Sequence, residues 1–333
     1  MKKILIIGGA GYIGSVLTDD LLNAGYEVCC FDNFLYHNNH CVLPYIGRKN
    51  YQFFYGDVCN LSALTSALVD VTDVVLLAGL VGDPITKKYP EIAEKINDQG
   101  IRNTIDHLKN YNIEKVVFIS TCSNYGLINN DELADENFPL NPLSLYAKAK
   151  VSAENYLLNL RRIVDYTPTV LRFATAFGLS PRMRFDLTVN EFTRDLALGK
   201  ELLVYDADTW RPYCHVRDFG RLIIKVLEAP LETVGFEVFN AGGDINNYTK
   251  QGIIDLILKK LPYASVRYQQ HGGDPRNYRV DFRKVRDVLN FEPQYTVEDG
   301  VAELLDAMGN KIFTQVDKTP NIFGNYNIDY NLK

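Results

Sequence analysis

The chain has 333 residues, of which 47% are hydrophobic and 23% are charged, and this balance is ordinary for a globular protein. Its formal net charge of −6 argues against a nucleic-acid or membrane-surface partner, because those surfaces are themselves negative. The six cysteines form no CxxC pair and the five histidines lack a partner set for zinc, so we expect reduced thiols, a cytoplasmic location and no metal site.

The first predicted element is a strand, turn and helix with three spaced glycines. An apolar run leads into Gly8, Gly11 and Gly14, and an apolar helix face follows them. Such glycines permit the turn, let the backbone approach a pyrophosphate and allow the helix to pack on the strand. A second strand over residues 27–31 ends in Asp32, where a carboxylate would meet the adenosine ribose. No arginine follows to receive a 2′-phosphate, so the pattern favours NAD(H) over NADP(H).

Further strand-like runs alternate with helical stretches, at residues 51–55, 73–77, 115–120 and 167–171. This rhythm predicts an α/β fold built on a Rossmann-type, doubly wound parallel sheet. The rhythm breaks at about residue 174. We therefore expect an NAD-binding domain over 1–173 that carries the catalytic residues, and a smaller C-terminal α/β domain over 174–333 that mainly binds the substrate. No apolar run approaches the length of a membrane span, and the N-terminus leads directly into the first strand.

Small and polar residues follow the third and fourth strands, at the edge where such a sheet binds its ligand. Asp57 and Val58 come after the third strand, and Asp57 could meet the adenine amino group. Ala78 and Gly79 come after the fourth and would leave room for the cofactor. A turn or a close-packed strand end explains either segment equally well. Asn97, at the head of a later helix, is a capping or surface residue unless its amide faces the cofactor.

A tyrosine and a lysine stand four residues apart near the start of a predicted helix, so Tyr146 and Lys150 share one face. Thr121 lies just past the strand over 115–120. A free tyrosine titrates near pH 10, but a nearby ammonium and the positive nicotinamide ring favour its phenolate. Tyr146 could then remove a proton from a sugar hydroxyl while the carbon beneath gives hydride to NAD⁺. Thr121 would bond the same oxygen, and Lys150 would also hold the nicotinamide ribose.

These motifs together resemble the extended short-chain dehydrogenases/reductases of the NAD-dependent nucleotide-sugar epimerase/dehydratase family. The resemblance covers nearly the whole chain, including the segments 171–173 and 211–218. It implies an NAD-dependent enzyme acting on a nucleotide-sugar substrate. It also implies a homodimer formed through a four-helix bundle that includes the helix of Tyr146. A stripe of small and apolar residues on that helix suits packing against another helix or against a second subunit: Ala149, Ala153, Tyr156, Leu157 and Leu160.

The motifs and the resemblance assign three sets of site residues. The expected catalytic residues are Thr121, Tyr146 and Lys150. The expected cofactor-binding residues are Gly8, Gly11, Tyr12, Ile13, Gly14, Asp32, Asn33, Asp57, Val58, Ala78, Gly79, Asn97, Tyr146 and Lys150. The expected substrate-binding residues are Thr121, Cys122, Ser123, Thr175, Arg182, Arg211 and Arg276.

Each arginine of the substrate-binding set is expected to bind the substrate for a different reason. Arg182, with Arg184 beside it, could face a nucleotide diphosphate or stand solvated in a loop. Arg211 lies in a segment that resembles the family's phosphate-contacting strand. Arg276 belongs to a glycine-rich turn that would close over the nucleotide, although Gln270 precedes that turn where the family often has an arginine.

Two departures from the family pattern bear on the reaction. Cys122 and Ser123 stand where 4,6-dehydratases have an Asp-Glu pair, so dehydration is not expected. Thr175 stands where typical 4-epimerases have an asparagine that meets the diphosphate, so the phosphate contacts must differ. The tail from Lys318 onward is predicted to be poorly packed or to wrap around the protein.

The net reaction stays open between related alternatives. The first is epimerisation at C4 of a nucleotide-activated sugar in surface-polysaccharide biosynthesis. The second is a net C4 dehydrogenase or 4-keto reductase on a nucleotide-linked heptose or deoxysugar, which would use every one of the same catalytic residues. The segment 171–187 resembles a bacterial branch of the family that contains all three activities. A non-catalytic NAD-binding scaffold is the alternative from another class.

Overall fold

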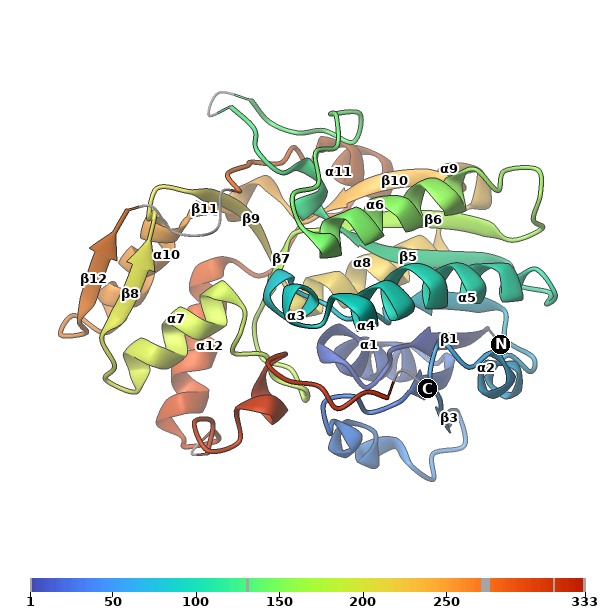
Figure 1. The fold of residues 1–333 in the computed structure, drawn as a ribbon, viewed down its shortest axis with the longest axis horizontal. Helices are drawn as coiled ribbons and strands as arrows, with labels where there is room; N and C mark the ends of the chain where they lie inside the picture. Colours follow the sequence, from blue (N-terminus) through green and yellow to red (C-terminus); the bar gives the residue numbers. More distant parts are fainter. Residues whose placement is uncertain (1, 130–131, 271–275, 314, 332–333) are drawn as a thin grey trace.

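A parallel sheet forms the centre of the computed structural model, which describes residues 2–129, 132–270, 276–313 and 315–331 (Figure 1). Its seven strands run in the order β10-β6-β5-β4-β1-β2-β3. Their bounds are β1 (Lys3–Ile7), β2 (Glu27–Asp32), β3 (Tyr51–Tyr55), β4 (Asp73–Leu76), β5 (Lys115–Thr121), β6 (Thr167–Phe173) and β10 (Glu237–Ala241). The predicted α/β fold with a Rossmann-type sheet is confirmed.

Helices cover both faces of this sheet. Successive side chains of each strand point to opposite faces, so alternate residues contact different helices. Ile4 and Ile6 of β1 face α1 (Tyr12–Asn23) and α8 (Val216–Glu228), whereas Leu5 and Ile7 face the opposite layer. The helices of that opposite layer are α2 (Leu61–Ala67), α5 (Ile101–Leu108) and α6 (Leu145–Leu158). Further helices near the sheet are α3 (Asp83–Lys88), α4 (Pro90–Glu94), α9 (Leu231–Val234) and α11 (Arg283–Leu289).

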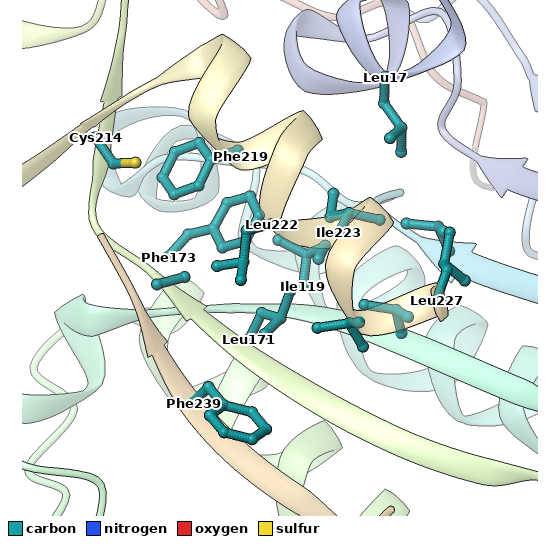
Figure 2. Close-up of a cluster of buried hydrophobic side chains, with 14 of the residues drawn as sticks. Leu17, Ile119, Leu171, Phe173, Cys214, Phe219, Leu222, Ile223, Leu227 and Phe239 are labelled. Carbon is teal, nitrogen blue, oxygen red and sulfur yellow. The ribbon is translucent and has the colours of Figure 1, made fainter. Parts of the chain in front are cut away.

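The core under α8 brings together strands that are far apart in sequence (Figure 2). Phe219 of α8 stacks on Phe173 of β6 with 3.7 Å between ring centroids. Figure 2 shows Leu222 and Ile223 of the same helix above Ile119 of β5. Burial of such side chains stabilises the fold by about 1.5–3 kcal/mol each. This packing fixes the end of β5, where the predicted catalytic threonine lies.

The last strand of the sheet comes from beyond residue 173. β10 pairs in parallel with β6, with Phe239 opposite Leu171. This pairing covers an edge that β6 would otherwise leave open. The division into 1–173 and 174–333 stays a prediction. Residues 216–241 follow the predicted boundary in sequence, yet they contain α8 and β10, which belong to the layers of the central sheet.

The remaining elements form what we call the C-terminal lobe, at the left of Figure 1. One small sheet joins β7 (Thr175–Phe177), β9 (Trp210–His215) and β11 (Asn247–Thr249), and another pairs β8 (Leu202–Tyr205) with β12 (Val266–Gln269). Its helices are α7 (Thr188–Ala197), α10 (Lys250–Lys260) and α12 (Val297–Gly309). Short 3₁₀ turns are η1 (Asn39–Cys41), η2 (Leu43–Tyr45), η4 (Cys122–Tyr125), η5 (Asp244–Asn246) and η6 (Pro320–Phe323), whereas η3 (Lys95–Gly100) is a π-helical segment that joins α4 to α5.

The helix that carries Tyr146 begins where a sequence signal places its start. Ser144 is the N-cap of α6, and its hydroxyl accepts a hydrogen bond from Ala147 N–H at 3.1 Å. Such a cap satisfies a backbone donor that the first turn leaves free. The helix therefore starts one residue before Tyr146, and this start fixes which face the tyrosine occupies.

The apolar stripe expected at a dimer contact lies mostly in the core of this chain. Ala153, Leu157 and Leu160 are buried among residues of β5, β6 and α5, and Leu157 is fully buried. The hydroxyl of Tyr156 is bound to Asp106 of α5 at 2.5 Å. The buried members of the stripe therefore pack within the subunit, as the alternative of a neighbouring helix expects, whereas Ala149 and Tyr156 stay partly exposed. The homodimer stays a prediction that rests on the family resemblance.

None of the described helices has the length and apolar character needed to cross a membrane.

Candidate functional site

A pocket of about 410 Å³ opens at the carboxyl ends of the central strands, between the sheet and the C-terminal lobe. Parallel strands of this kind bind their ligands at that edge. The pocket wall includes nearly all of the residues expected to bind cofactor or substrate. The two that do not line it are Asn97 and Cys122. Residues far apart in the sequence, such as Gly8, Tyr146 and Arg211, thus meet at one site.

The glycine turn after β1 is shaped so that a ligand can approach its backbone. Gly8 has φ +89°, and an added Cβ there would lie 2.8 Å from the backbone N of Ala78. A Cβ on Gly14 would lie 2.5 Å from the carbonyl oxygen of Gly8. Gly11, Tyr12 and Ile13 line the pocket between these two glycines. The turn therefore places a helix N-terminus, a favourable position for phosphate, against the pocket.

Gly14→Ala is expected to weaken NADH binding about tenfold or more, since the added methyl forces the turn to move. NADH titration followed by nicotinamide fluorescence measures the effect. Gly309→Ala is the matched control, because a Cβ at Gly309 meets no atom within 4 Å. If Gly14→Ala binds NADH as tightly as Gly309→Ala does, the turn does not hold the cofactor.

Asp32 and Asp57 are held by backbone groups at the ends of β2 and β3. Asp32 accepts hydrogen bonds from Ala10 N–H at 3.0 Å and Phe34 N–H at 2.9 Å, and burial raises the pKa of its carboxyl. Asp57 accepts from Cys59 N–H at 2.7 Å and from the Asn33 amide at 2.9 Å. Asp32, Asp57 and Asn33 line the pocket, as does Val58. These acceptors are placed as binding an adenosine requires.

Asn97 supports the loop after β4 and does not line the pocket. Its side-chain oxygen accepts from Leu80 N–H at 2.7 Å, and its nitrogen donates to Leu80 C=O at 2.9 Å. Both ends of the amide are therefore bound by the backbone of one buried residue, Leu80. The expectation that Asn97 contacts the cofactor directly is corrected to a supporting role. Ala78 and Gly79 do line the pocket, and Gly79 has φ +154° beside the Asn97 oxygen.

The three expected catalytic residues converge where β5 ends against α6. Lys150 is 6% exposed and donates from Nζ to Ile119 C=O at 2.7 Å. Its Nζ lies 6.0 Å from the ring centroid of Tyr146. Thr121 lies at the end of β5, and its Oγ1 accepts from Ser123 N–H at 3.1 Å. Thr121, which can form a hydrogen bond to a sugar oxygen, and Tyr146, which can exchange a proton with that oxygen, thus line the same wall of the pocket.

Burial is the largest influence on both titrating groups. It lowers the pKa of Lys150 to about 8, opposed by the negative charge of Glu154. It raises the pKa of Tyr146 well above the usual value, and Arg184 opposes this change. The expectation that nearby positive charge makes Tyr146 a phenolate is thus not met by the protein alone. The positive nicotinamide ring would have to supply that stabilisation.

Cys122 does not reach the pocket, because it points into the hydrophobic core. Its thiol donates to the carbonyl oxygen of Arg172 at 3.1 Å, and the residue is 1% exposed. Its neighbours Thr121 and Ser123 do line the pocket. The expectation that Cys122 contacts the substrate is therefore wrong, since adjacent side chains at the strand end point to opposite sides.

Two arginines of the loop after β7 are buried in the pocket wall. Arg182 is 1% exposed and donates to Gly324 C=O at 3.0 Å, and burial lowers its pKa to about 10. Arg184 forms an ion pair of 2.5 Å with Asp186. The alternative of solvated loop arginines is thus wrong for both.

Arg211 and Arg276 also line the pocket, as does Thr175. Arg276 forms an ion pair of 2.6 Å with Asp83 of α3, and Arg211 donates to the carbonyl oxygen of Arg276. The guanidinium groups of Arg182, Arg184, Arg211 and Arg276 give this wall the charge and the donors that suit a diphosphate. The glycines of the turn that precedes Arg276 lie outside the described residues.

Two pocket residues that the sequence reasoning missed carry unused polar atoms. The hydroxyl of Tyr36 and the side-chain oxygen of Asn38 are buried and have no hydrogen-bond partner among the described residues. Buried polar atoms of this kind call for a partner. Together with the glycine cradle, they fit a bound dinucleotide. Both follow Asp32 closely, so the polar loop 33–40 was the signal that could have identified them.

Comparison with known proteins agrees with this geometry. The sequence profile of the NAD dependent epimerase/dehydratase family matches residues 4–242. The UDP-glucuronate 4-epimerase of Thermodesulfobacterium geofontis is 26% identical over 313 residues, covering 90% of this chain and 94% of that protein. The low-salt glycan biosynthesis protein Agl12 of Haloferax volcanii is 26% identical over 311 residues, covering 91% and 97% respectively.

Solved structures agree as well. A Thermotoga maritima UDP-glucose 4-epimerase with UDP-glucose superposes with a TM-score of 0.82 at 26% identity, covering 93% of this chain and 99% of that one. A Bacillus cereus UDP-glucuronic acid 4-epimerase in complex with UDP-glucuronic acid and NAD gives 0.82 at 25% identity with the same coverage. The chain therefore belongs to the NAD-dependent epimerase/dehydratase family, and its cofactor is NAD.

Proposed function

We propose that this protein is an NAD-dependent epimerase acting at C4 of a nucleotide-activated sugar. One observation carries the proposal: Thr121, Tyr146 and Lys150 line the same pocket as the glycine turn and the four arginines. A sugar whose diphosphate binds the arginines would present its ring to the end of β5. The 4-epimerases among the relatives support this choice of substrate class.

The residues of the chain divide the chemistry between them. NAD, when bound, supplies the acceptor for a hydride from C4. Tyr146 removes the proton of the C4 hydroxyl, and Thr121 donates a hydrogen bond to the same oxygen. Lys150, positioned by the Ile119 carbonyl, holds the nicotinamide ribose and favours the tyrosine phenolate. Gly8, Gly11 and Gly14 admit the pyrophosphate, and Asp32 binds the adenosine ribose.

Elimination of water is not part of the proposal. A dehydratase needs an acid and a base beside the threonine, whereas Cys122 is buried in the core and Ser123 carries a hydroxyl. A net C4 dehydrogenase or 4-keto reductase is the second candidate. It is supported by the resemblance of residues 171–187 to a branch of the family that contains dehydrogenases and reductases as well as epimerases.

A panel assay separates these reactions. The protein is incubated with UDP-, GDP-, CDP- and dTDP-sugars, with and without added NAD(H), and followed by nicotinamide absorbance and product NMR. We expect a product inverted at C4 with no net change in cofactor. Stoichiometric formation or consumption of NADH would identify the dehydrogenase or reductase instead. If the protein binds NADH but turns over none of these sugars, the non-catalytic scaffold would be favoured.

We further propose that the reaction serves surface-polysaccharide biosynthesis in the cytoplasm. The similarity to the low-salt glycan biosynthesis protein Agl12 supports the pathway. The reduced cysteines support the compartment, since all six are free thiols. Loss of a surface glycan on deletion of the gene would test the pathway directly.

A further inference from the structure

The last described part of the chain crosses the mouth of the pocket. Residues 319–331, which we call the C-terminal strap, include η6 and then run from the C-terminal lobe towards β3 (Figure 1). The family profile ends at residue 242, so the strap lies outside the matched region. Asn325 and Tyr326 of the strap line the pocket, and Asn325 is 9% exposed.

One end of the strap is fixed to the C-terminal lobe. Phe323 C=O accepts a hydrogen bond from Phe185 N–H at 2.7 Å. Gly324 C=O accepts from the guanidinium of Arg182 at 3.0 Å. The strap is therefore joined to the same loop that carries the arginines of the pocket wall.

The other end of the strap contacts the loops that follow β4 and β3. Asn325 donates from its side chain to Val81 C=O at 2.9 Å, and Lys88 of α3 donates to Tyr326 C=O at 3.3 Å. Farther along, Tyr330 packs against the hydrophobic cluster to which Val58 of the loop after β3 belongs. The loop after β4 holds Ala78 and Gly79, and the loop after β3 holds Asp57, so both belong to the cofactor site.

A third contact joins the strap to the loop after β2. Ile328 packs with Leu35 and Tyr36 against a small cluster built on Leu80 and Ile85. The hydroxyl of Tyr36 is one of the two buried pocket oxygens described above that have no partner among the described residues. The guanidinium carbon of Arg182 lies 4.8 Å from the centroid of the Tyr36 ring. The strap thus covers all three loops that would surround the dinucleotide.

We propose that the C-terminal strap is part of the NAD site and retains the dinucleotide, so that cofactor exchange requires the strap to lift. Asn325 holds the strap to the loop after β4, and Lys88 of α3 holds it through the carbonyl oxygen of Tyr326. A dinucleotide lying on the ends of β2, β3 and β4 would leave only after these bonds between lobe and sheet had broken. This inference rests on NAD as the cofactor and is independent of which sugar the protein uses.

The dissociation rate of NADH tests the proposal in the full-length protein. Bound NADH is chased with excess NAD⁺ and its fluorescence is followed. We expect Asn325→Leu and Lys88→Met each to release NADH roughly 3- to 10-fold faster, which is the effect of one lost hydrogen bond. Asn310→Leu is the matched control, because Asn310 lies at the end of α12 and its side chain bonds Asp306. Its NADH dissociation rate should equal that of the wild type.

Dissociation rates of Asn325→Leu and Lys88→Met equal to that of the control would overturn the proposal. If the two variants do not fold, amide hydrogen exchange of the wild-type protein decides. NADH should then slow exchange across residues 320–331, and unchanged exchange there would equally overturn it. Both measurements use NADH without a sugar, so failure to turn over any nucleotide sugar leaves their outcome unaffected.

Discussion

Tyr146→Phe is expected to lower kcat by a factor of about 10² to 10⁴, the range that positioned proton transfer contributes. The phenyl ring keeps the shape of the pocket wall but has no hydroxyl to exchange a proton with the sugar. Tyr146 stands on α6 one turn before Lys150, which contacts the backbone of β5 through Ile119 C=O. The loss should therefore fall on the chemical step, while NADH still binds.

Steady-state kinetics on the nucleotide sugar found by the panel assay gives kcat, and fluorescence titration gives the NADH affinity. Tyr263→Phe is the matched control, since Tyr263 is 99% exposed. A Tyr146→Phe enzyme that kept the kcat of the Tyr263→Phe control would rule out Tyr146 as the group that exchanges the proton. Loss of NADH binding in the same variant would instead indicate a structural role.

Local patterns account for the parts of the fold and site that the sequence predicts. β3 has the predicted bounds and β1 is the apolar run that leads into Gly8, because an apolar run followed by a turn signal encodes a buried strand locally. The glycines after β1 and the carboxylate after β2 meet because a βαβ unit brings neighbouring strand ends together. Ser144 caps α6 for an equally local reason.

Non-local contacts account for what the sequence could not predict. The pairing of β10 with β6 depends on a strand more than sixty residues away in the chain. Asn97 and Cys122 stand close to the site in sequence, yet the direction of each side chain is set by its packing. The burial of Arg182 depends on the strap, whose composition carries no motif. Each of these features appears only when distant segments are brought together.

Glu154→Leu is expected to destabilise the fold by about 3–5 kcal/mol, because it leaves the guanidinium of Arg172 buried without its partner. Glu154 lies on α6 and Arg172 on β6, with side chains 1% and 6% exposed and an ion-pair distance of 2.9 Å. The carboxylate also accepts from Asn124 Nδ2 at 2.7 Å, and Arg172 donates to the hydroxyl of Tyr125 at 3.0 Å. This buried network lies under the segment that follows Thr121.

Urea denaturation of Glu154→Leu, Arg172→Leu and the double variant measures the effect. Removing both charges leaves no unpaired ion, so the double variant should be more stable than Glu154→Leu alone. A double variant that lost as much free energy of unfolding as the two single variants together would mean that the pair acts through packing and not through charge.

Because the network fixes the segment from Ser120 to Tyr125, the folded double variant should also show a lower kcat than the wild type while it still binds NADH. An unchanged kcat would mean that β5 and the core under α8 hold Thr121 in place without the ion pair.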